Sequence, residues 1–173
     1  MQLKKDKGFM LHRSGRFYMG GFSFVLPDNI YLNTALEDGR DSGLQLFAPD
    51  GSYCMEIYAE NCYVDAKAFF EGKDDGLELS AFPRTSPIIS VVCGGRSGFC
   101  QYYTAQRCGY CEIRFDYVNE ELDINTICIL VNADKSMIVQ LMQSQQIQEL
   151  LNSIRWEDTF PHCSSKATAP PEF

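Results

Sequence analysis

Two cysteines three positions apart have the spacing in this 173-residue chain that is most suggestive of chemistry. Cys108 and Cys111 enclose Gly109-Tyr110, and two thiolates at this spacing can bind zinc or form a redox pair. A tetrahedral zinc site needs about four ligands, usually from a second pair at similar spacing. The sequence offers no such second pair. Cys108 and Cys111 are therefore the candidate metal ligands, with core packing as the competing interpretation.

Side-chain alternation favours core packing for Cys111. Residues two apart on a strand share a face. Along residues 110–118 the odd positions from Cys111 onward are apolar, whereas the even positions carry Glu112, Arg114 and Asp116. Cys111 therefore joins an apolar row. A metal site, a disulfide or a catalytic thiol is the alternative, and the metal site predicts stoichiometric zinc in the purified protein.

A glycine-rich segment is the second candidate site. Gly94-Gly95-Arg96-Ser97-Gly98 follows the apolar run 87–93. Its backbone N–H groups could hold an anion, and Arg96 could add a bidentate contact. The segment lacks the lysine of a phosphate-binding P-loop and leads into a strand instead of a helix. Arg96 and Ser97 are therefore candidate contacts for an anion or a partner, and a flexible hairpin turn is the competing interpretation.

No set of residues in the sequence identifies a catalytic centre. Both histidines, His12 and His162, lie near the chain ends, whereas a general base must be held within hydrogen-bond reach of its target. No carboxylate pair stands out from the acidic loops. We therefore predict no catalytic residues and no cofactor, and a non-enzymatic role is favoured.

Charge and hydropathy restrict the partners and the compartment. The formal net charge is −8, so an acidic surface would repel the phosphate backbone of a nucleic acid. No apolar run approaches the roughly 20 residues that a membrane-spanning helix needs. The apolar stretch 8–11 stops at His12-Arg13, too early for a secretion signal. We expect a bacterial cytoplasmic protein, or a secreted or lipid-anchored one if a leader peptide has been removed.

The elements that would position these residues are mostly strands. The pattern predicts a strand at 20–26, a hairpin within 44–59 and further strands between 87 and 131. A short helix is expected at 65–71, and an apolar stripe predicts a long amphipathic helix over 136–154. The fold class is therefore α+β, with a mainly antiparallel sheet of about six to eight strands and both helices packed on it.

The expected organisation is one domain with two flanking segments. Residues 1–16 form a basic N-terminal segment, 17–158 the single α+β domain, and 159–173 a small, polar, proline-bearing tail that we expect to be mobile.

Three stretches within residues 17–158 carry a family resemblance. They are 22–28, 97–103 and 150–156, which open the fold, begin a strand pair and end the last helix. Together with the element order they resemble the PsbP-like superfamily, which includes the photosystem II extrinsic PsbP protein, a Ran-binding nuclear-import accessory protein and uncharacterised bacterial proteins. Characterised members act mainly by binding a partner, so the resemblance implies a protein-binding or accessory domain. No functional residue is carried over.

Three functions remain open at this point. The first is a non-catalytic domain that binds another protein. The second is a small-ligand-binding domain or enzyme with a pocket between sheet and helix. The third is a metal- or redox-responsive domain that uses Cys108 and Cys111.

Overall fold

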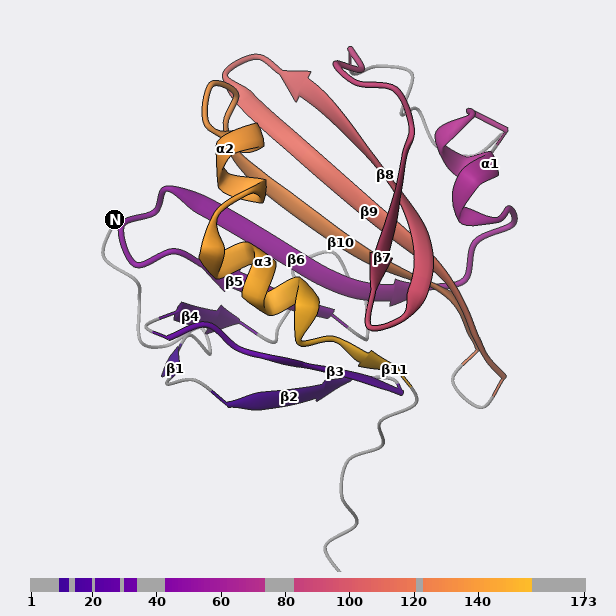
Figure 1. Ribbon diagram of the computed structural model, residues 1–173, viewed down its shortest axis with the longest axis horizontal. Helices are drawn as coiled ribbons and strands as arrows, with labels where there is room; N and C mark the ends of the chain where they lie inside the picture. Colours follow the sequence, from indigo (N-terminus) through magenta and orange to yellow (C-terminus); the bar gives the residue numbers. More distant parts are fainter. Residues whose placement is uncertain are drawn as a thin grey trace, which may run out of the picture.

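The structure is a computed structural model that describes residues 10–12, 15–19, 21–28, 30–33, 43–73, 83–120 and 123–156. In these residues the chain forms two antiparallel sheets and three short helices (Figure 1). The larger sheet has eight strands in the order β1-β4-β5-β6-β10-β9-β8-β7, and the smaller sheet has three in the order β11-β3-β2. None of the described helices is long and apolar enough to cross a membrane.

The strands and helices have the following bounds. The larger sheet contains β1 (Met10–His12), β4 (Ile30–Asn33), β5 (Gly43–Phe47), β6 (Tyr53–Glu60), β7 (Ile89–Cys93), β8 (Arg96–Ala105), β9 (Cys108–Asn119) and β10 (Ile124–Asp134). The smaller sheet contains β2 (Arg16–Met19), β3 (Phe22–Val25) and β11 (Arg155–Trp156). The helices are α1 (Ala66–Phe70), α2 (Ile138–Met142) and α3 (Gln145–Asn152).

The hydrophobic core lies on one face of the larger sheet. Ile129 of β10 pairs with Ile57 of β6 and with Ile113 of β9, so apolar side chains form rows across neighbouring strands. Helices α2 and α3 and the smaller sheet cover this face (Figure 1). Gly109 permits the close approach of α2, because a Cβ atom there would lie 2.7 Å from Ile138 Cγ2. The opposite face of the sheet carries α1.

The predicted fold class is wrong, because the long C-terminal helix does not form. Strand accounts for 55% of the structure and helix for 15%, so the fold is dominated by sheet. The segment predicted as one helix over 136–154 contains α2 and α3 instead. Ser144 separates them, since its extended backbone breaks the helical path and its side chain caps α3 by accepting a hydrogen bond from the Ile147 N–H at 3.4 Å.

The shorter predicted helix is present as α1. Asp65 is its N-cap and accepts a hydrogen bond from the Ala68 N–H at 2.7 Å.

The flanking segments of the expected domain organisation are described only in part. Strand β1, within the segment 1–16, pairs with β4 of the larger sheet. Arg16 begins β2 and donates a hydrogen bond to Ser23 Oγ at 2.8 Å. The tail 159–173 lies outside the described residues. The proposed division into segments remains a prediction.

Substitution of Gly98 tests the packing of β8 on β9. A Cβ atom at Gly98 would lie 2.5 Å from both the Arg114 carbonyl oxygen and Phe115 Cδ1. Gly98→Ala is therefore expected to lower the free energy of unfolding by about 2 kcal/mol, as overpacking does. Ser90→Ala, at an exposed position of β7, is the control and should change it by less than about 0.5 kcal/mol. Urea denaturation measures both. Wild-type stability in Gly98→Ala would contradict this packing.

Candidate functional site

Strand β7 is an edge strand without the usual protection. Among the described residues the larger sheet ends at β7, and its five residues include no charged residue and no proline. Ile89 is 38% exposed and Val92 is 66% exposed. Natural edge strands are commonly protected by charges, prolines or bulges, because their free backbone groups can pair with another chain. This edge therefore presents backbone donors and acceptors beside exposed apolar side chains.

The register of β7 indicates which of its backbone groups face outward. Cys93 and Arg96 pair on either side of the two-residue turn Gly94-Gly95. The residues that flank such a turn form a hydrogen-bonded pair, and hydrogen-bonded pairs then alternate along the hairpin. The backbone groups of Cys93 and Val91 therefore point toward β8, whereas those of Val92 point toward the free edge.

An open pocket lies at the turn that ends β7. It has a volume of about 660 Å³ and is lined by residues of the β7–β8 turn and of the end of the described chain, namely Gly94, Gly95, Arg96, Ser97, Ile154, Arg155 and Trp156. The structure thus brings the two predicted contacts, Arg96 and Ser97, together with Arg155 and Trp156. Sequence reasoning missed the latter two because they are distant in the chain from the glycine-rich segment.

Aromatic rings hold the Arg96 side chain in place. Its guanidinium carbon lies 5.1 Å from the centre of the Tyr117 ring and 4.9 Å from that of Trp156. Its Nη1 donates a hydrogen bond to the Asp116 carbonyl oxygen at 3.0 Å. Its Nε is buried and has no hydrogen-bond partner among the described residues. Arg96 is therefore fixed by packing, with part of its donor capacity unused.

Gly94 is required for the turn to lie against β11. Its φ of +57° is in the left-handed region, and a Cβ atom there would collide with the carbonyl oxygen of Ile154. The indole Nε1 of Trp156 donates a hydrogen bond to the Cys93 carbonyl oxygen at 2.7 Å. These two contacts set the position of the pocket at the end of β7.

The structure does not bring Cys108 and Cys111 together. Cys108 is exposed and Cys111 is fully buried, and residues three apart on a strand point to opposite faces. The neighbour of Cys111 is Cys100, and a hydrogen bond between these thiols, together with burial, raises the pKa of Cys111. Among the described residues no group of three or more histidine, cysteine, aspartate or glutamate side chains is arranged to hold a metal ion.

Thiol labelling at pH 8 separates core packing from the metal-site hypothesis. Cys108 should react rapidly in the native protein, and Cys111 only after unfolding, because it is buried and its raised pKa keeps it a thiol. Mass mapping of alkylated peptides, with and without added zinc, measures this. Protection of both cysteines by zinc, or stoichiometric zinc in the purified protein, would support the metal site instead. Cys108→Ser is the matched control for the labelling pattern.

A buried ion-pair network occupies the opposite face of the sheet, beneath α1. Glu112 and Arg114 are each 3% exposed, and Arg114 Nε donates to Glu112 Oε1 at 2.7 Å. Arg114 also pairs with Glu60, and the Phe69 ring of α1 lies 3.3 Å from its guanidinium carbon. The Tyr103 hydroxyl donates to Glu112 Oε2 at 3.3 Å. The alternation in the sequence placed Glu112 and Arg114 in a polar row, but it gave no sign that this row is buried.

Two thiols border this network. Cys62 Sγ donates to Glu60 Oε1 at 3.0 Å, and Cys128 Sγ lies 3.5 Å from Glu112 Oε1. Burial, aided by the Glu60 carboxylate, raises the pKa of Cys62 to about 11. Both cysteines therefore remain protonated near neutral pH, which does not suit a nucleophile.

Removal of one member of the buried ion pair should destabilise the fold. Arg114→Met leaves Glu112 without its compensating charge, so the free energy of unfolding should fall by about 3–5 kcal/mol. The double variant Arg114→Met/Glu112→Leu should recover a large part of that loss, because it removes both charges. Urea denaturation of the two single variants and the double variant measures the coupling. Additive losses would show that the two side chains do not interact.

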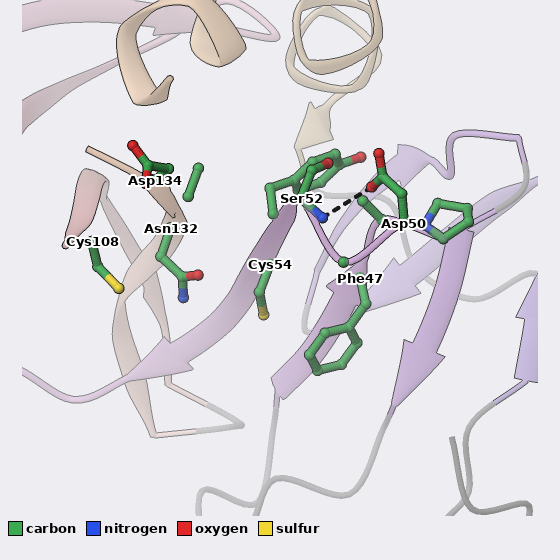
Figure 2. A pocket seen from close by; sticks show the side chains of 12 residues that line it. Phe47, Asp50, Ser52, Cys54, Cys108, Asn132 and Asp134 are labelled. Carbon is green, nitrogen blue, oxygen red and sulfur yellow. Dashed lines mark hydrogen bonds between the residues drawn. The ribbon is translucent and has the colours of Figure 1, made fainter. Parts of the chain in front are cut away.

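A smaller pocket lies at the start of β6, beside the turn that joins it to β5 (Figure 2). It has a volume of about 380 Å³, and Cys108, Asn132 and Asp134 lie to the left of it in this view, with Ser52 and Asp50 to the right. Tyr53 also lines it, and its buried hydroxyl has no partner among the described residues. Burial and the nearby Asp50 carboxylate raise the pKa of Tyr53 to about 12. Cys108 thus lines this pocket, on the opposite face of β9 from Cys111.

Comparison with known proteins does not assign a family. No family model matches the chain, and no curated protein matches it. A solved structure, that of LpqN, described as involved in cell envelope biogenesis of Mycobacterium tuberculosis, is similar over 90% of this chain and 88% of its own. The identity is 10% and the TM-score is 0.42, so this likeness carries no argument about function.

Proposed function

We propose that the chain is a non-catalytic protein-binding domain that binds an extended segment of a partner along β7. The observation that supports this is the exposed, uncharged, apolar edge of the larger sheet. Binding by strand addition takes its affinity from main-chain hydrogen bonds and its specificity from alternate side chains.

The side chains of β7 favour an apolar, extended partner segment. Val92 and Ile89 are on opposite faces of the strand and are both exposed. A partner strand with β-branched residues would cover each of them with a neighbouring side chain, which is the unit of stabilisation between paired strands. The outward backbone groups of Val92 would supply the hydrogen bonds.

Several earlier expectations remain part of this proposal. The resemblance to PsbP-like proteins agrees with a binding role. A bacterial cytoplasmic location and the exclusion of nucleic acid remain predictions from charge and sequence. A small-ligand-binding domain or enzyme with a pocket between sheet and helix remains an alternative, although the Tyr53 pocket is lined by strand and turn residues. A metal- or redox-responsive role would depend on Cys108 and Cys111.

Val92→Pro tests strand addition directly. Proline removes an N–H that points toward the free edge, so pairing with β8 and the urea midpoint should stay close to those of the wild type. Selection from a random peptide display library should enrich extended apolar peptides on the wild-type protein, and Val92→Pro should not retain them. Val92→Thr is the matched control, because it keeps the N–H and the β-branched shape, and it should bind the selected peptides within about threefold of wild type.

Three results would count against this function. One is the absence of any peptide enrichment over bare support, and another is equal retention of the selected peptides by Val92→Pro. The third is concentration-dependent dimerisation that Val92→Pro abolishes in sedimentation velocity, since β7 would then bind a second copy of the chain.

A further inference from the structure

Arg96 and Arg155 line the pocket beside β7, and neither forms an ion pair with a described residue. The protein as a whole is acidic, with a formal net charge of −8, and this pocket nevertheless has two arginines in its lining. Arg114, by contrast, is paired with two carboxylates. The two pocket arginines therefore form a local positive site in an acidic protein.

Arg96 is ordered before any ligand arrives. The Tyr117 and Trp156 rings flank its guanidinium, and Nη1 is held by the Asp116 carbonyl oxygen. Immobilisation of a long side chain normally costs binding free energy, and this cost has already been met by folding. A guanidinium N–H that is neither buried nor already bonded can donate a charge-assisted hydrogen bond to a carboxylate.

The pocket lies at the turn in which the edge strand ends. The turn Gly94-Gly95 lines the pocket and directly follows Cys93, the last residue of β7. A partner segment that pairs with β7 and continues past the turn would therefore come close to the pocket. If such a ligand is an unmodified polypeptide, the anionic groups that it carries near neutral pH are carboxylates.

We propose that the pocket formed by Arg96 and Arg155 binds a carboxylate of the partner segment that pairs with β7. This inference rests on the proposed function, because strand addition is what makes the ligand a polypeptide. The recognised segment then has an apolar extended part and an acidic group next to it.

Acetate is the probe for the pocket alone. Titration of the full-length ¹⁵N-labelled protein with sodium acetate, with sodium chloride as the ionic-strength control, should give saturable shifts of the Arg96 and Arg155 side-chain N–H signals and of the Gly95 amide. Arg155→Gln and Arg96→Gln should each weaken binding about tenfold, the loss expected for one charge-assisted pair. Arg155 is exposed, so its variant remains informative if loss of the Arg96 packing impairs folding.

Arg107→Gln is the matched control. Arg107 is exposed in the turn at the other end of β8, so its replacement should leave acetate binding unchanged. Absence of saturable shifts, an equal loss in Arg107→Gln, or tighter binding of inorganic phosphate than of acetate at equal ionic strength would each overturn the carboxylate assignment.

Val92→Pro separates this inference from the function on which it rests. Acetate should still bind to Val92→Pro, because the pocket does not use the free edge, and that result supports the pocket even if peptide selection fails. In the second arm, peptides selected on the wild-type protein should carry Asp, Glu or a free terminal carboxylate and bind about tenfold more weakly to Arg155→Gln. Selected peptides without an acid group that bind Arg155→Gln as tightly as wild type would overturn the inference and leave strand addition intact.

Discussion

The packing of Trp156 is the interaction on which the arrangement of the two sheets depends. Its ring lies 5.7 Å from Phe22 of the smaller sheet and 5.1 Å and 5.6 Å from Phe115 and Tyr117 of the larger one. Each aromatic pair of this kind contributes about 0.5–1.5 kcal/mol beyond the burial of its area. The indole N–H also binds the Cys93 carbonyl oxygen. One residue at the end of the described chain thus joins both sheets to the end of β7, and the arginine pocket exists because of it.

The two faces of the larger sheet are stabilised in different ways. The face under α2 and α3 is apolar, whereas the face under α1 buries Arg114 and Glu112. A buried ion pair is costly to desolvate, and it is retained only when its hydrogen bonds are made. Here Arg114 and Glu112 bond to each other, and Glu60 and Tyr103 supply further partners. Helix α1 covers the pair with Phe69, and its Ala66 N–H binds Asp116 Oδ1 at 2.8 Å. The polar row therefore helps to position α1, together with the burial of Phe69 and Phe70.

Local patterns in the sequence predicted local structure, and their failures have physical causes. Alternation placed Cys111 among apolar side chains, where it lies, and the short helix expected at 65–71 is present as α1. The single long helix was wrong because an apolar stripe has the same spacing in one helix as in two that cover one face, and the Ser144 cap divides them. For the pocket beside β7, the sequence predicted Arg96 and Ser97 but not Arg155 and Trp156. The bond between Trp156 and Cys93 joins residues 63 positions apart. The periodicity of a short stretch of sequence does not predict such a long-range contact.

The charges around β7 favour a partner segment over a second copy of the chain. Exposed Arg84 lies before the strand, and Arg96 and Arg155 lie at its end. Antiparallel pairing of two β7 strands would place the arginines of one copy beside those of the other, and like charges oppose association. An apolar segment with an acidic group meets attraction at the same place. The arginines before and after β7 thus take the place of the protective charges that the strand itself lacks. They oppose pairing of β7 with a second copy and still allow pairing with an acidic partner segment.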